Sequence, residues 1–97
     1  MRVESRSRAE EDVGNIERRW RANRQITPDL FLDELEATIA ALLRPPTLGA
    51  PARALPLHRV RRVLMRRTRS YIYYRVFRET LEVLAVWHAS RDREPAV

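Results

Sequence analysis

The hydrophobic pattern of the chain changes its period near residue 59, and this change constrains the fold more than any other feature. Before it, apolar residues recur every three or four positions, as on one face of an α-helix. After it come three segments rich in β-branched and aromatic residues, joined by links of one or two residues: Val60–Thr68, Ser70–Phe77 and Thr80–Trp87. Because a parallel connection needs about a dozen residues, links this short predict antiparallel pairing. We therefore predict a three-stranded antiparallel sheet over residues 59–88.

The part of the chain before this sheet predicts two amphipathic helices, over residues 8–24 and 28–44. Their apolar stripes are Ala9, Val13, Ile16 and Trp20 in the first helix and Phe31, Leu35, Ile39 and Leu42 in the second. Spacings of three and four residues place each stripe on one helical face. A short link between two such helices predicts an antiparallel helical hairpin.

Local signals mark where these helices begin and end. Ser7 followed by Glu10 has the spacing of a capping box at the start of the first helix. Thr27 precedes a proline and an aspartate, which is a typical start for the second helix. Pro45 and Pro46 end it, because proline has no backbone N–H to donate.

The remaining segments complete one predicted domain over residues 1–97. Residues 1–6 are expected to form a short strand, 45–58 a proline-rich loop and 89–97 a tail. The fold class is then α+β, with the order β-α-α-β-β-β and the helical hairpin packed on one face of a small antiparallel sheet. The last strand is apolar at nearly every position, so we expect it inside the sheet. The residues expected between hairpin and sheet are Trp20, Phe31, Leu35, Leu42, Val83 and Ala85.

Positive charge is concentrated in the second half of the chain. The net charge is +6, and every basic residue is an arginine. Residues 59–78 hold eight arginines and no acidic residue. Such a field favours an anionic partner, either nucleic acid or an acidic protein. The alternative is a solvated sheet face in a protein that prefers arginine.

Several functional classes are disfavoured by composition. The chain has no cysteine, so it has neither disulfides nor thiolate metal sites, and a reducing cytoplasm is expected. No apolar run approaches the roughly 18 residues of a membrane span, so no membrane association is expected. No glycine-rich phosphate loop, metal-ligand cluster or Ser-His-Asp pattern is present, and we expect no cofactor and no metal.

Several segments, taken in order, resemble the ParE/RelE superfamily of bacterial type II toxins, and its ParE branch most. The segments that carry the resemblance are Arg8–Asp12, Phe31–Leu35, the loop from Pro46 to Pro51, Arg61–Arg69, Tyr71–Val76 and Val83–His88. The resemblance implies the same fold that the hydrophobic pattern predicts. It also implies a partner, a cognate ParD-like antitoxin of the ribbon-helix-helix class encoded beside the toxin. The implied target is DNA gyrase for ParE-like members and mRNA on the ribosome for RelE-like members.

Two sets of candidate site residues follow. If the chain is a nuclease, His88 would move protons while Arg67 and Arg91 stabilise a phosphate. The simpler interpretation of His88 is a polar residue at a strand end. The residues expected to contact a target, whichever it is, are Arg61, Arg62, Arg66, Arg67, Arg69, Arg75 and Arg91.

Three tyrosines lie on the middle strand of the predicted sheet. Alternation places Tyr71 and Tyr73 on the face of Arg75, and Tyr74 on the opposite face. Tyrosines beside arginines can stack bases, although such residues are more often core or cross-strand pairs.

RelE-like nucleases carry lysines on the sheet and a tyrosine near the C-terminus. This chain has no lysine, and no tyrosine after Tyr74. We therefore predict a toxin of a plasmid-stabilisation module that inhibits DNA gyrase as a protein inhibitor rather than as an enzyme. The alternatives are a ribosome-dependent mRNA endoribonuclease and a decayed, non-toxic basic binding domain.

Overall fold

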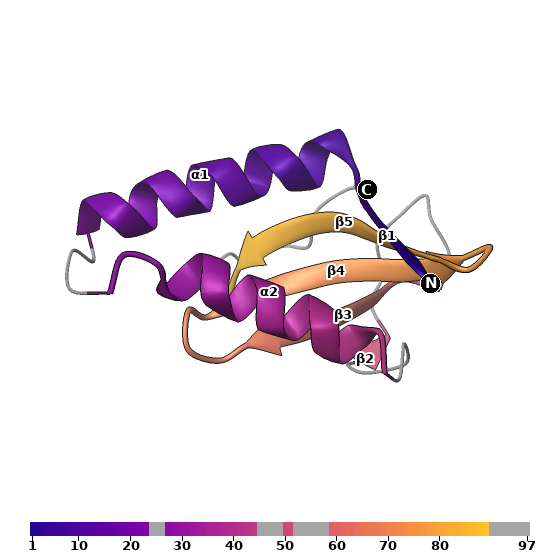
Figure 1. The fold of residues 1–97 in the computed structure, drawn as a ribbon. Helices are drawn as coiled ribbons and strands as arrows, with labels where there is room; N and C mark the ends of the chain where they lie inside the picture. The colour runs from indigo at the N-terminus through magenta and orange to yellow at the C-terminus, as the bar shows by residue number, and fades with distance from the viewer. Residues whose placement is uncertain (24–26, 45–49, 52–58, 90–97) are drawn as a thin grey trace.

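The computed structural model describes residues 1–23, 27–44, 50–51 and 59–89 as two helices packed on a sheet (Figure 1). The elements in chain order are β1 (Arg2–Ser5), α1 (Ser7–Asn23), α2 (Leu30–Leu42), β2 (Ala50–Pro51), β3 (Arg61–Met65), β4 (Ser70–Phe77) and β5 (Thr80–His88). The sheet has the strand order β1-β5-β4-β3-β2. Both helices contribute to one apolar core with residues of β3, β4 and β5. The predicted α+β class, with helices covering one face of the sheet, is confirmed.

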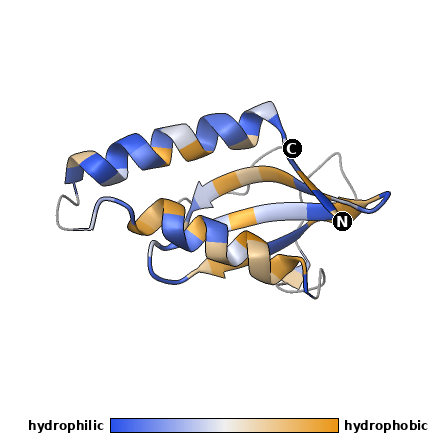
Figure 2. Ribbon diagram, viewed as in Figure 1, coloured by the Kyte–Doolittle hydropathy of each residue, from blue (hydrophilic) through white to orange (hydrophobic). Residues whose placement is uncertain are grey.

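The sheet is mixed rather than wholly antiparallel. The three predicted strands pair antiparallel as expected, but β1 runs parallel to β5, with Arg2 opposite Thr80 and Ser5 opposite Val83. No short link joins these two strands, so chain connectivity leaves their relative direction open. β5 therefore lies inside the sheet, between β1 and β4, as its apolar sequence predicts. Figure 2 shows β5 as hydrophobic over most of its length.

A β-bulge in β5 changes which side chains face the helices. Tyr73 pairs with Ala85, whereas the next residue, Tyr74, pairs with Val83, so Leu84 is an extra residue in β5. As a result Leu84 and Ala85 both lie in a second buried cluster, with Tyr73 and apart from the helices. The expectation that Ala85 packs between hairpin and sheet is wrong, because it assumed an unbroken period of two. The alternation of β4 itself is unbroken, and Tyr74 lies in the helix-facing core.

The main core contains most of the residues predicted for it. Phe31, Leu35 and Leu42 of α2 are buried against Val83 of β5. Trp20, near the end of α1, is only half-buried, and its indole N–H donates to the carbonyl of Thr27 at 2.7 Å. A tryptophan at the edge of a core keeps its polar end near an acceptor in this way.

The helix starts differ by one or two residues from the predicted capping signals. α1 begins at Ser7 itself, and the carbonyl of Arg6 accepts the N–H of Glu10 at 3.0 Å. α2 begins at Leu30, with Asp29 as its N-cap and no side-chain capping bond. The Asp29 carboxylate instead pairs with Arg21 of α1 at 2.6 Å. Arg21 donates hydrogen bonds to the carboxylates of Glu17 and Asp29, and these bonds, that to Glu17 first, raise the pKa of Arg21. The start of α2 is thereby tied to a charged side chain of α1.

Two further observations complete the fold. The β4–β5 link consists of Arg78 and Glu79, with φ of 49° and 59°, as in the two-residue hairpin turns whose central residues are left-handed. Neither α1 nor α2 is long and apolar enough to cross a membrane.

Candidate functional site

Three exposed arginines occupy the turn between β3 and β4. This arginine turn (residues 66–69) contains Arg66, Arg67 and Arg69, and all three are exposed. The backbone N–H of Arg69 donates to the carbonyl of Met65 at 2.8 Å, and Arg69 has a φ of 60°. No ion pair joins any of the three guanidinium groups to another described residue. Their charge is therefore available to an anionic partner.

A carboxylate from α2 fixes the backbone of this turn. One oxygen of Glu34 accepts the N–H of Thr68 at 3.0 Å and its hydroxyl at 2.6 Å. The other oxygen accepts the N–H of Arg67 at 2.9 Å. Thr68 is only 3% exposed, so its N–H and its hydroxyl have little access to water. The clamp holds the backbone still while the arginine side chains extend into solvent.

His88 lies at the same end of the sheet as the arginine turn. It pairs with Ser70, the first residue of β4, and the N–H of Ala89 donates to the carbonyl of Arg69 at 2.8 Å. His88 is exposed, so a polar strand-end residue and a proton carrier are both compatible with its position. Of its two predicted companions, Arg67 lies in the neighbouring turn and Arg91 lies outside the described residues.

The remaining predicted contact residues do not join this surface. Arg75 is half-buried and its Nε lies 2.6 Å from the carboxylate of Glu82, which neutralises it. Arg62 stacks over the ring of Tyr71 at 4.3 Å, on the sheet face that points away from the helices. Arg61 lies on the other face, opposite Tyr74.

The tyrosines of β4 are buried or stacked rather than free to receive bases. Tyr73 and Tyr74 are buried, on opposite faces of the sheet. The rings of Tyr71 and Tyr73 lie 6.3 Å apart in a tilted arrangement, as cross-strand and same-face aromatic pairs do. Burial raises the pKa of Tyr74, and the positive charge of Arg61 lowers it in part.

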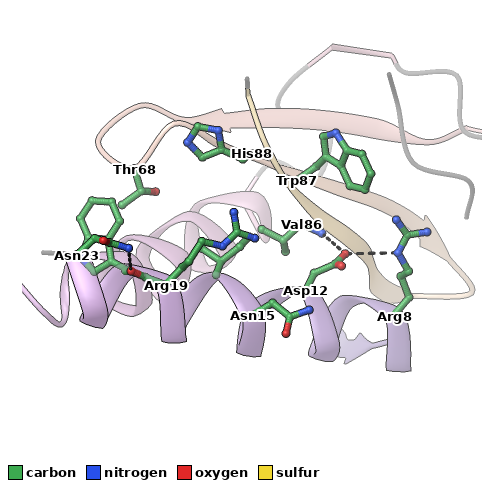
Figure 3. A pocket seen from close by; sticks show the side chains of 11 residues that line it. Arg8, Asp12, Asn15, Arg19, Asn23, Thr68, Val86, Trp87 and His88 are labelled. Atoms are coloured by element: carbon green, nitrogen blue, oxygen red, sulfur yellow. Dashed lines mark hydrogen bonds and ion pairs between the residues drawn. The ribbon is translucent and has the colours of Figure 1, made fainter. Parts of the chain in front are cut away.

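A hollow between α1 and the end of β5 adjoins the arginine turn (Figure 3). We call it the α1–β5 groove, with a volume of about 520 Å³. Its lining residues are Arg8, Asp12, Asn15, Ile16, Arg19, Trp20, Asn23, Thr68, Val86, Trp87 and His88. Asp12 accepts the N–H of Val86 at 3.0 Å and lies 3.7 Å from the Nε of Arg8. The guanidinium of Arg8 lies 5.5 Å from the centre of the Trp87 ring.

Sequence reasoning missed Glu34, Asp12 and the α1 arginines that line the groove. Glu34 and Asp12 are ordinary acidic positions on amphipathic helices, and the backbone N–H groups that donate to them lie 34 and 74 residues away. No local pattern marks such contacts. Among the described residues, no cluster of three or more His, Asp or Glu side chains could hold a metal ion.

Comparison with solved structures gives the same fold. A chain of the chromosomal ParDE TA system from P. aeruginosa is 15% identical, with a TM-score of 0.74, over 93% of this chain and 97% of that one. The isolated E. coli RelE toxin is 17% identical, with a TM-score of 0.60, over 95% and 87%. A chain of the intact E. coli RelBE toxin–antitoxin complex is 17% identical, with a TM-score of 0.58, over 93% and 98%. At these identities the likeness concerns the fold.

Comparison at the level of sequence identifies the family. A search of curated protein sequences gave no match. The model of the ParE toxin of the type II toxin-antitoxin system parDE, in contrast, matches residues 3–93. This match spans both helices, β2 to β5, all of β1 but its first residue, the arginine turn and the α1–β5 groove. The chain therefore belongs to the ParE toxin family of type II toxin–antitoxin systems.

Proposed function

We propose that this chain acts in the cytoplasm of a bacterium as the toxin of a plasmid-stabilisation module that inhibits DNA gyrase. Membership of the ParE family supports the role of a toxin. The observation that carries the gyrase target is the arginine turn, whose three exposed guanidinium groups are unneutralised among the described residues. A rigid, positively charged projection suits binding to an acidic protein surface or to a protein–DNA complex.

The proposed mode of action is binding rather than catalysis. The side chain best placed to move protons is His88, which is exposed at a strand end, and the carboxylates nearest to the turn and the groove are engaged in structural bonds. Glu34 holds the turn and Asp12 holds β5. Catalysis of RNA cleavage needs a general base within reach of the substrate, and arginine is a poor one because its pKa lies above about 12.

The proposed partner is a cognate, ParD-like antitoxin of the ribbon-helix-helix class encoded beside the toxin. Support comes from the family and from the fold shared with a ParDE system and a RelBE complex. Production of the chain alone should stop growth, and co-production of the neighbouring antitoxin should restore it. Normal growth despite abundant folded protein would instead support a decayed, non-toxic domain.

The test of the target is a supercoiling assay with purified gyrase and the antitoxin-free chain. We expect the chain to inhibit supercoiling of relaxed plasmid DNA in a concentration-dependent way. The matched measurement is primer extension on mRNA from cells that produce the chain. Absence of gyrase inhibition, together with discrete mRNA cuts, would contradict the proposal.

The second candidate function is a ribosome-dependent mRNA endoribonuclease. One observation favours it: His88 lies beside the arginine turn, so a proton carrier and phosphate-binding groups share one end of the sheet. In that case His88 would be the group that transfers the proton, with Arg67 and Arg91 as the proposed phosphate ligands. Loss of mRNA cuts in His88→Ala, with the variant still folded, would support this alternative.

A further inference from the structure

The two edge strands of the sheet differ in whether another strand can pair with them. β2, at one edge, is two residues long and contains Pro51, which has no N–H to donate. β1, at the other edge, has four residues, and all of them are exposed (Figure 1). An exposed edge with free backbone groups is a template for pairing with another chain. In the described sheet, β1 is therefore the edge on which a further strand can add.

The backbone of β1 points alternately toward β5 and away from it. The N–H groups of Arg2 and Arg6 donate to carbonyls of the β4–β5 hairpin, at 3.2 and 3.0 Å. Because successive residues of a strand alternate, the N–H and C=O groups of Val3 and Ser5 point away from β5. No other described residue forms a hydrogen bond with these groups. The outer edge thus offers two residues, each with one donor and one acceptor.

The side chains of β1 divide into a charged row and an apolar position. Arg2 and Glu4 lie on one face of the strand, where they form an ion pair with each other. Val3 lies on the opposite face, paired with the buried Leu81 of β5, and is 39% exposed. A second valine placed against Val3 would extend the apolar row outward from Leu81.

Charge decides the register in which a second β1 would pair with the first in the antiparallel direction. A two-fold axis at Val3 sets Arg2 of each copy opposite Glu4 of the other. An axis at Arg2 or at Glu4 sets like charges directly opposite each other, which is destabilising. An axis at Ser5 sets Val3 opposite Ser7, which begins α1 and whose helical backbone cannot join a strand. The axis at Val3 is therefore the favoured one.

We propose that a second copy of this chain pairs with β1 in the antiparallel direction, with the two-fold axis at Val3 and with Arg2 of each copy facing Glu4 of the other. The two Val3 residues exchange backbone hydrogen bonds, and on either side the N–H of Ser5 donates to the carbonyl of Met1 of the second copy. The two sheets then form one continuous sheet.

This pairing leaves the arginine turn free. β1 lies beside the first residues of β5, whereas the arginine turn lies beside the last ones, at His88. Self-pairing therefore depends neither on the proposed gyrase target nor on the antitoxin.

The first test is the oligomeric state of the parent chain as a function of concentration. Four residues from each copy make a contact far smaller than that of a stable dimer, so we expect a dissociation constant on the order of 0.1 mM. Sedimentation equilibrium from about 1 µM to about 1 mM measures it. Amide exchange followed by NMR locates the contact, because the N–H groups of Val3 and Ser5 should exchange more slowly as the dimer forms.

The decisive test uses two charge reversals, alone and mixed. Glu4→Arg leaves two positive side chains on β1, and Arg2→Glu leaves two negative ones. Each variant alone should dimerise at least about tenfold more weakly than the parent, because like charges face each other. Mixed in equal amounts, the two variants should form a heterodimer about as tight as the parent dimer. Neither variant keeps the ion pair within its own strand, so the rescue reports pairing between chains.

Two further variants control for net charge and for the backbone contact. Glu36→Arg, at an exposed position of α2, makes the same change in charge as Glu4→Arg and should dimerise like the parent. Val3→Pro removes the outward N–H at the axis without breaking a hydrogen bond within the chain, and should be monomeric. Circular dichroism and thermal unfolding check that each variant is folded.

Three outcomes would overturn the inference: a monomeric parent at about 1 mM, undiminished dimerisation of either reversal variant alone, or no association in their mixture. Protection of the Val3 amide only in the presence of co-produced antitoxin would assign this edge to the antitoxin instead. Gyrase inhibition is measured in a separate assay, so failure of self-pairing and failure of the proposed target are distinguishable.

Discussion

The arginine turn at one end of the sheet and the arginines around Glu82 at the other end differ in whether an acidic side chain neutralises them. At one end the arginine turn presents Arg66, Arg67 and Arg69 without an ion pair to any described residue. At the other end, near the β4–β5 hairpin, Arg75 lies 2.6 Å from Glu82 and Arg6 lies 3.5 Å from the same carboxylate. The same residue type is thus a free surface charge in the arginine turn, whereas Arg75 is the counter-ion of a half-buried carboxylate.

The position of β1 explains this difference. Its parallel pairing with β5 places Glu4 opposite Glu82, and two carboxylates side by side repel each other. Arg2 pairs with Glu4, while Arg6 and Arg75 surround Glu82. No ion pair joins the guanidinium groups of the arginine turn to another described residue, and Glu34 points its oxygens at backbone donors. The count of eight arginines between residues 59 and 78 therefore overstates the charge that a partner meets.

The largest effect is expected from Glu34→Ala. This change removes the acceptor of two backbone N–H groups and the Thr68 hydroxyl, at a site where Thr68 is buried. Unsatisfied buried donors cost about 1–3 kcal/mol each, and partial access to water reduces the sum, so we expect a loss of about 3 kcal/mol in the free energy of unfolding. Urea denaturation measures it. Glu36→Ala, an exposed neighbour, should change stability by less than about 0.5 kcal/mol.

A loss below about 1 kcal/mol in Glu34→Ala would mean that the clamp does not hold the turn. The difference between the two ends of the sheet would then concern charge alone, and not also the rigidity of the turn.

The next effect is expected from a double change in the turn, Arg66→Ala with Arg67→Ala. Gyrase inhibition should fall by about tenfold, because each exposed arginine contributes modestly and the two act together. Stability should stay nearly the same, since neither side chain has an internal partner among the described residues. Unchanged inhibition in a folded double variant would move the target-binding surface away from the turn.

Arg75→Ala should give the reverse pattern at the opposite end. It leaves Glu82 half-buried with only the more distant Arg6, so we expect a loss of about 1 kcal/mol in unfolding free energy. Gyrase inhibition should remain within about threefold of the parent, because Arg75 is already neutralised. A large loss of inhibition without a loss of stability would show that the two ends are not distinct.

The smallest effect is expected from His88→Ala. If the chain inhibits gyrase by binding, inhibition should change by less than about threefold, since His88 would contribute at most one contact. A proton-transfer role predicts instead a rate loss of roughly 10²–10⁴-fold. Single-turnover cleavage of ribosome-bound mRNA separates these results, and the larger loss would favour the ribonuclease.

Local sequence was sufficient for the order and type of the elements except β2, because Ala50 and Pro51 fall in the segment 45–58 that was expected to be a loop. Apolar spacings in residues 8–42 predicted two helices, and the links near Arg69 and Arg78 predicted the two hairpins of β3, β4 and β5. The unbroken apolar run of β5 predicted its place inside the sheet. These features depend on neighbours within a few positions, which a sequence displays directly.

Tertiary packing decided which of the predicted arginines lie on the candidate surface. Of the seven arginines expected at the target, the fold leaves three in the exposed turn, neutralises Arg75 and separates Arg61 from Arg62 on opposite faces of the sheet. Arg91 lies outside the described residues, and its role stays a prediction. The bulge at Leu84 moved Ala85 to the face away from the helices, because one extra residue reverses the alternation after it.

The sequence by itself determined two helices, three antiparallel strands, a sharp change of charge between the halves of the chain and a resemblance to ParE toxins. Only the tertiary structure decided the parallel edge strand, the Glu34 clamp, the α1–β5 groove and the division of the arginines into paired and free. The physical reason is separation along the chain. Glu34 meets Thr68 across 34 positions and Asp12 meets Val86 across 74, and such contacts exist only once the helices have packed on the sheet.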